Sequence, residues 1–160
     1  MELLGVRLEL PANAPVVLLR ESGGDRRVLP IYIGPEEAKA IALALEGVST
    51  PRPMTHDLMR DLLVALGASV QRVVVTELRD STFFAEVELA LNGSTRRVSS
   101  RPSDAVALAV RVDAPIFASE DVLDDAAAPA EEEGGEAQQE EIVDEFRQFI
   151  EQVKPEDFGA

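Results

Sequence analysis

The 160-residue sequence contains no cysteine and a single histidine, His56. Without cysteine there are no disulfides, no thiol nucleophiles and no cysteine-ligated zinc or iron–sulfur sites. A single histidine also excludes sites that need several imidazole ligands within one chain. No apolar run approaches the roughly 20 residues that span a bilayer, and the first residues lack the basic segment and apolar stretch of a secretory signal. We therefore expect a cytoplasmic protein that does not enter a membrane.

Basic residues are scarce as well, because 15 Lys and Arg stand against 30 Asp and Glu, which gives a net charge of −15. Residues 1–119 carry 13 basic and 15 acidic residues, whereas residues 120–160 carry 2 and 15. Residues 126–138 lack branched and aromatic side chains, so they cannot bury enough apolar surface to offset the entropy of ordering. We predict a domain over 1–125, an acidic flexible linker over 126–138 and a C-terminal amphipathic helix and tail over 139–160.

Short apolar runs separated by glycine, proline and Asn-Gly punctuation predict an α+β domain with a mainly antiparallel or mixed sheet and about three core helices. The predicted strands are Leu3–Leu10, Val16–Leu19, Val28–Ile33, Val70–Leu78, Phe83–Leu91 and Thr95–Ser99, with a short extended segment at Ala114–Ala118. The core helices are predicted to run from Pro35 to Gly47, from the Pro53 elbow to Gly67, and over Ser103–Val112. Asn92-Gly93 predicts a two-residue hairpin.

Three features predict contacts with other molecules. The Leu3–Leu10 and Phe83–Leu91 strands lack the charge or proline that blocks edge pairing, so we expect a homo-oligomer. The second helix has an apolar side, formed by Leu58, Met59, Leu62, Leu63 and Leu66. The segment Glu140–Val153 has apolar residues every three or four positions, so it either docks on its own core or binds a protein partner.

All three core helices start with a nearby proline and an acidic residue in the first turn, at Gly34–Glu37, Pro53–Asp57 and Arg101–Asp104. A structural explanation is available for each, because acid at this position complements the helix dipole. If the starts meet in space, their carboxylates could hold Mg²⁺ or Mn²⁺, and their arginines could hold phosphate oxygens. His56 is the side chain whose ordinary pKa suits proton transfer near neutral pH.

The segments Ile31–Ala38, Arg52–Leu58 and Arg101–Ala109 resemble the bifunctional nuclease (BFN) domain family over about residues 1–123. The chain ending, Phe146–Phe149 and Pro155–Phe158, resembles actinobacterial members. The resemblance implies an α+β domain that self-associates and, as in plant members, nuclease activity on DNA and RNA. Many relatives carry Asp at the position of Ser99 and Tyr at that of Phe84, so one carboxylate that could ligate a metal is missing here.

Together these observations predict a metal-dependent nuclease that hydrolyses phosphodiester bonds of DNA or RNA. The predicted catalytic residues are His56, Arg52, Arg101 and Asp104. Substrate contacts are predicted for Arg52, Thr55, Arg101 and Ser103. A divalent ion, Mg²⁺ or Mn²⁺, is predicted at Glu37, Asp57 and Asp104, where it would activate water and neutralise charge on the phosphate.

Two other functions stay open. The helix starts could be capped structural features of a non-catalytic regulatory or protein-binding module, or they could hold a small anionic ligand such as a nucleotide. The charge balance counts partly against nucleic acid, because residues 1–119 have no obvious basic excess. A further hypothesis is that the acidic tail competes with nucleic acid for an arginine patch formed by Arg26, Arg27, Arg96 and Arg97.

Overall fold

The computed structural model describes residues 1–129 and contains two sheets and four helices. The strands are β1 Glu2–Glu9, β2 Ala14–Arg20, β3 Val28–Tyr32, β4 Ser69–Arg79, β5 Thr82–Leu91, β6 Ser94–Ser100 and β7 Ile116–Ala118. The helices are α1 Pro35–Leu45, α2 Thr55–Ala65, α3 Pro102–Val112 and α4 Glu120–Ala126. None of these helices is long and apolar enough to cross a membrane. The predicted α+β class is confirmed.

The first sheet has the order β1-β2-β3 and is antiparallel, and the second has the order β6-β5-β4-β7 with β7 parallel to β4. The Asn-Gly hairpin forms as expected: Leu91 pairs with Ser94, and both turn residues adopt positive φ, 51° at Asn92 and 76° at Gly93. These are the dihedral signs of a type I′ turn, whose twist matches that of the flanking strands. The sequence therefore fixes the register of β5 against β6.

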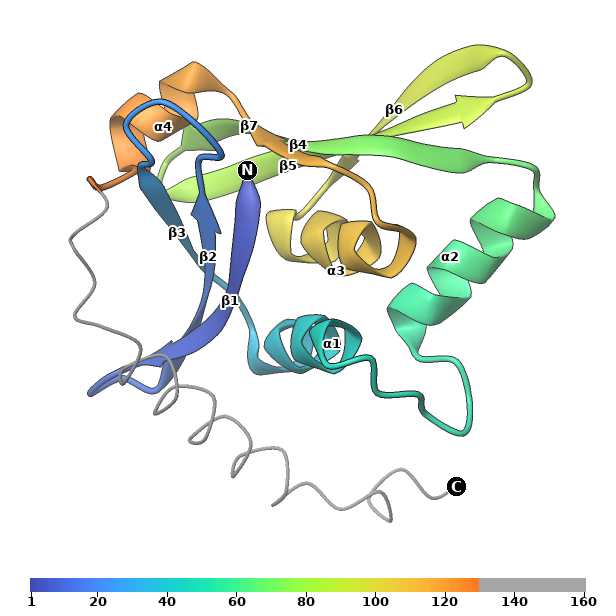
Figure 1. Cartoon of the computed structure of the whole chain (residues 1–160), viewed down its shortest axis with the longest axis horizontal. Helices are drawn as coiled ribbons and strands as arrows, with labels where there is room; N and C mark the ends of the chain where they lie inside the picture. The colour runs from blue at the N-terminus through green and yellow to red at the C-terminus, as the bar shows by residue number, and fades with distance from the viewer. Residues whose placement is uncertain (130–160) are drawn as a thin grey trace.

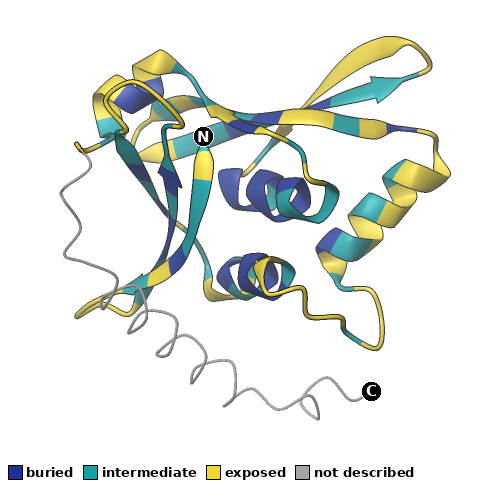
Figure 2. Cartoon of the chain, in the orientation of Figure 1, coloured by how far each residue is buried: buried dark blue, intermediate teal, exposed yellow. Residues whose placement is uncertain are grey.

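Helix α3 lies at the centre of the domain, where it contacts α1, α2, β4 and β5 (Figure 1). Most of its residues between 102 and 109 are buried, as its nearly continuous apolar sequence predicts (Figure 2). Helix α1 packs against α3 and also contacts β1 and β2 of the first sheet. Buried side chains from both sheets, α1, α3 and α4 form one core cluster. The starts of α1 and α3 are consequently held by a common interior.

Three expectations about edges and boundaries are corrected. Strand β5 is not an edge, because it lies between β4 and β6, whereas β1, β3, β6 and β7 end the two sheets. A fourth helix, α4, was not predicted, and Ser119 caps it by accepting a hydrogen bond from the Val122 amide at 3.4 Å. The first residues of the predicted linker pack on the domain, since Ala128 exchanges two backbone hydrogen bonds with Val28. The rest of that linker and the Glu140–Val153 segment lie outside the described residues.

The apolar side of α2 is largely uncovered. Leu58, Leu62 and Leu66 expose 52%, 53% and 71% of their surface, and Leu63 alone of the predicted set packs against the core cluster. The reason is that α2 contacts α3 through its first turn and then projects from the body, as Figure 1 shows. Its periodic pattern predicted an apolar face correctly but could not say whether that face meets the core.

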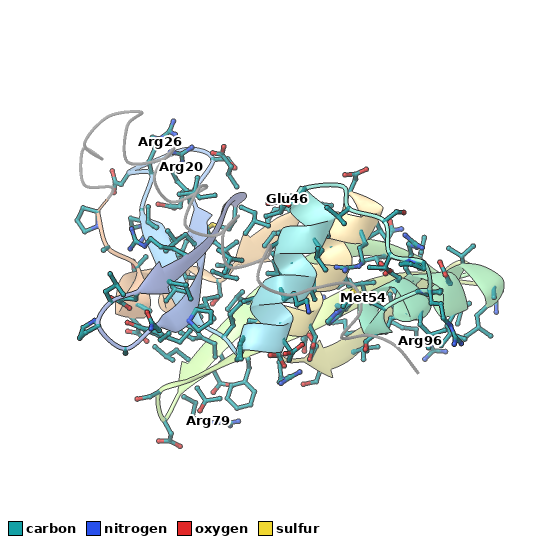
Figure 3. The ribbon with its side chains drawn as sticks, turned by 90° about the horizontal axis from the view of Figure 1, so that it is seen from below. Arg20, Arg26, Glu46, Met54, Arg79 and Arg96 are labelled. Atoms are coloured by element: carbon teal, nitrogen blue, oxygen red, sulfur yellow. The ribbon has the colours of Figure 1, made fainter. Side chains whose placement is uncertain are left out.

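The proposed arginine patch is not formed. Arg26 and Arg96 lie toward opposite ends of the long axis (Figure 3). Arg27 is paired with Glu21 and Asp124, and Arg97 is paired with Glu88. Short-range carboxylate partners neutralise these cations, so the described residues offer the acidic tail no single basic face there.

Candidate functional site

The starts of three helices meet around one guanidinium group. Arg101, which precedes α3, donates to Asp104 Oδ2 from Nε at 2.8 Å and to Asp104 Oδ1 from Nη2 at 3.1 Å. The same Nη2 lies 2.9 Å from Glu37 Oε1 in the first turn of α1. His56, in the first turn of α2, has Nε2 3.0 Å from Asp104 Oδ1. We call Glu37, His56, Arg101 and Asp104 the helix-start cluster; the structure brings together these four of the predicted site residues.

Asp104 fixes the protonation state of this cluster. Burial acts to raise the pKa of Asp104, but the hydrogen bonds from Arg101 and His56 outweigh it and hold the pKa below its ordinary value. An ionised carboxylate only accepts hydrogen bonds, so Nε2 of His56 must carry the proton on that side. In the neutral ring, Nδ1 is then left as the basic nitrogen.

The other ring nitrogen of His56 keeps access to solvent. The His56 side chain is 8% exposed, and Nδ1 makes no hydrogen bond within residues 1–129. It is also absent from the buried polar atoms of that region that have no partner. Nδ1 is therefore not fully buried, so it can accept a proton from a water molecule.

Glu37 reaches Arg101 because Gly34 leaves room for it. Gly34 caps α1 with extended backbone, and a Cβ atom built there would overlap Oε2 of Glu37. The Glu37 side chain thus folds back over the helix start and is only 18% exposed. Arg101 itself is 66% exposed, so one face of its guanidinium remains open to an anion from solvent.

Asp57 and Arg52 are not part of the helix-start cluster. Asp57 turns the other way, where Oδ1 accepts a hydrogen bond from Arg111 Nε at 2.6 Å and Oδ2 accepts one from the Met54 amide at 3.0 Å. Burial acts to raise the pKa of Asp57, but these two hydrogen bonds outweigh it and hold the pKa below its ordinary value. Arg52 lines a separate pocket together with Asp57 and Arg111.

The carboxylates do not form a metal site as they stand. Within residues 1–129 no three His, Asp or Glu side chains are placed to hold a metal ion. Asp57 is bound to Arg111, and Arg101 occupies the position between Glu37 and Asp104. A divalent ion entering there would have to displace a guanidinium that already satisfies both carboxylates, so the residues present do not fit the predicted ion.

The two remaining predicted residues differ in accessibility. Thr55 is exposed at the first position of α2, beside His56, whereas Ser103 is 7% exposed at the second position of α3. A ligand bound over the helix-start cluster could contact Thr55 directly. Ser103 would contact substrate only after local movement of α3.

Arg111 is the residue that the sequence reasoning missed. Its side chain is 5% exposed and donates to Asp57, to the Ala107 carbonyl at 2.8 Å and to the Ala40 carbonyl at 3.0 Å, so it ties three helices together. A signal was present, because Arg111 is the one charged residue between Asp104 and Asp113 in an otherwise apolar helix. A charge in such a helix needs a buried partner.

Comparisons with known proteins identify the family of this chain. The family model for the bifunctional nuclease domain matches residues 17–131. An uncharacterized protein of Mycobacterium tuberculosis is 46% identical over all of this chain and 98% of its own length. Bifunctional nuclease 1 of Oryza sativa subsp. indica is 30% identical over 68% of this chain, and bifunctional nuclease 2 of Arabidopsis thaliana is 31% identical over 67%. The match covers only 34% of either plant protein. On the family match, the chain belongs to the bifunctional nuclease domain family.

Proposed function

We propose that this chain hydrolyses phosphodiester bonds of DNA or RNA at the helix-start cluster. The observation that carries the proposal is the ordered contact from Arg101 to Asp104 to His56, with hydrogen-bond distances of 2.8 and 3.0 Å. Membership of the bifunctional nuclease domain family supports the substrate class.

Each residue of the cluster has a distinct part in this reaction. Asp104 accepts the Nε2 proton of His56 in a hydrogen bond and so leaves Nδ1 as the base, which removes a proton from water as the water oxygen attacks phosphorus. The exposed face of Arg101 binds the phosphate oxygens and stabilises the added charge of the transition state. Glu37 positions Arg101. The proton held by His56 is returned to the departing alkoxide oxygen, which restores the neutral ring.

The test is cleavage of end-labelled single-stranded DNA and RNA by the purified chain. We expect His56→Gln and Asp104→Asn each to lower the rate about 100-fold or more, since a general base contributes about 10²–10⁴-fold. Arg26→Gln, in the loop between β2 and β3 and outside the cluster, is the matched control and keeps the wild-type rate. Cleavage that persists in both cluster variants would assign the activity to a contaminant and refute the proposal.

The cofactor expectation is tested in the same assay with Mg²⁺, with Mn²⁺ and with a chelator. The mechanism above proceeds in the presence of chelator, because no step depends on a metal ion. A strict requirement for Mg²⁺ or Mn²⁺ would mean that Arg101 leaves Glu37 and Asp104 in the active state. That result would contradict the role given to Arg101 while keeping the nuclease assignment.

The uncovered face of α2 favours a second candidate function, self-association without catalysis. Its exposed leucines and the edge strand β6, all of whose residues up to Ser99 are exposed, offer apolar and backbone contacts to a second copy of this chain. Leu62→Glu places a charge in this face, and light scattering should then show a smaller particle than the wild type. An unchanged mass would count against the α2 face as an interface.

A further inference from the structure

A pocket of about 400 Å³ lies at the first turn of α2, on the side of Asp57 and not of His56. Its walls are the last turn of α1, the elbow 47–53, the start of α2 and the end of α3. The volume falls within the range of about 300–1,000 Å³ that is typical of small-molecule sites. None of the four helix-start cluster residues lines it. Arg111 at this pocket is seven residues from Asp104, or about 10 Å along α3, so the two are separate binding positions.

The pocket carries uncompensated positive charge. Arg52, Arg60 and Arg111 line it, with Asp57 as the acidic residue among them. Arg111 is neutralised by Asp57 at 2.6 Å, and Arg60 by the neighbouring Asp61 at 2.8 Å. Arg52 has no ion pair with any residue of 1–129. Its guanidinium therefore remains available to an anion.

The backbone holds Arg52 in place before any ligand arrives. Pro51 and Pro53 flank it, and proline restricts both its own φ and the residue before it. The hydroxyl of Thr50 donates to the Arg52 carbonyl at 2.6 Å. Because the chain is already constrained, binding costs less entropy than it would from a free loop. The planar guanidinium suits two parallel hydrogen bonds to phosphate.

The pocket is larger than a phosphate group, and most of its accessible lining is polar. Leu43, Val48 and Val110 line it, and Val48 leaves 48% of its surface exposed. Polar groups around a few apolar side chains suit a sugar and a base attached to the anionic group. We infer that this pocket binds a nucleotide, with the phosphate on Arg52 and the nucleoside against Val48 and Val110. The inference goes beyond the proposed function, because binding here requires no cleavage.

The test is titration of the full chain with adenosine 5′-monophosphate, with a 5′-phosphorylated dinucleotide and with inorganic phosphate. Calorimetry gives the affinity, and amide chemical shifts locate the site. A salt concentration of 0.15 M limits long-range repulsion from the acidic chain, since the Debye length is then about 8 Å. The variants are Arg52→Gln and, as the matched control, Arg26→Gln. Arg26 lies far along the long axis from Met54, the residue that follows Pro53 of the pocket (Figure 3).

We expect saturable binding of at least one of the two nucleotides, with shifts confined to residues 43–60 and 110–111. Arg52→Gln should weaken it about ten-fold or more, which is the usual effect of losing a charge-assisted hydrogen bond, and Arg26→Gln should not. Binding of the dinucleotide alone identifies the end of a nucleic-acid strand as the ligand. Binding of both nucleotides shows that a free mononucleotide is sufficient. Equal affinity in Arg52→Gln, binding of neither nucleotide, or phosphate binding as tight as that of the nucleotides would overturn the inference. These readouts are independent of whether His56→Gln stops cleavage.

Discussion

Replacing Arg111 by methionine should destabilise the domain far more than replacing a nearby surface arginine. The change keeps most of the buried side-chain volume but removes the hydrogen bonds to Asp57 at 2.6 Å and to the Ala40 carbonyl at 3.0 Å. Breaking a fully buried ion pair costs about 3–5 kcal/mol. The Asp57 side chain is 23% exposed, so water recovers part of this, and we expect a loss of about 2–4 kcal/mol.

Arg60→Met is the matched control, because Arg60 pairs with Asp61 at 2.8 Å while both side chains stay more than a third exposed. Exposed pairs of this kind contribute at most about 1 kcal/mol. Urea unfolding followed by circular dichroism should show the midpoint of Arg111→Met falling by on the order of 1–2 M, and that of Arg60→Met hardly moving. Equal midpoints for the two variants would refute the three-helix role of Arg111.

The pH dependence provides a second check on the same pair. Because Asp57 has a lowered pKa in the folded protein, its contribution is fully present above its ordinary pKa of 3.8 and is lost as the pH falls through the folded value. The stability gap between wild type and Arg111→Met should therefore be constant near neutral pH and narrow in acid below about pH 4. A gap that widens in acid would mean that Asp57 is not held ionised by Arg111.

Three smaller predictions follow from local geometry. Gly34→Ala displaces the flexible end of Glu37 from Arg101, so cleavage should fall while the thermal midpoint stays near that of wild type; an unchanged rate would remove Glu37 from the positioning role. Ser119→Ala removes the α4 cap and the hydrogen bond to the Thr76 carbonyl at 3.0 Å and should cost about 1 kcal/mol or more in chemical unfolding, whereas no loss would mean that neither contact contributes. The stability that Asp104 gains from Arg101 and His56 is present above its ordinary pKa of 3.8, so the stability gap between wild type and Asp104→Asn should narrow below about pH 4, and a gap that widens in acid would contradict the lowered pKa.

Most of the fold could be predicted because its punctuation is local. Proline before each core helix, glycine after α1 and α2, and the Asn-Gly turn fix where elements begin and end without reference to the rest of the chain. Strand β5 was placed correctly along the chain, but its prediction as an edge was wrong, because hairpins pair one of its sides with β4 and the other with β6. The parallel pairing of β7 with β4 is the part of this sheet that no short-range pattern encodes.

The candidate site could be predicted only in part, because spacing does not reveal direction. Glu37, His56 and Asp104 were expected to meet and do so. Asp57 follows His56 directly, yet the 100° step between successive helix positions turns it toward Arg111. Arg52 shares a motif with both, but its prolines direct it to another pocket. Adjacent residues thus serve opposite sides of one helix turn.

The attachment of α2 has a thermodynamic consequence for the whole domain. Two polar links, from His56 to Asp104 and from Asp57 to Arg111, join this helix to α3. Leu62 and Leu66, further along the helix, are exposed. A ligand that competed for Asp104 or Arg111 would loosen the helix as it bound. By reciprocity, a molecule that clamped the outer leucines would change the affinity for that ligand by the same factor. Ligand binding at the start of α2 and binding of a molecule to its exposed leucines are therefore linked equilibria.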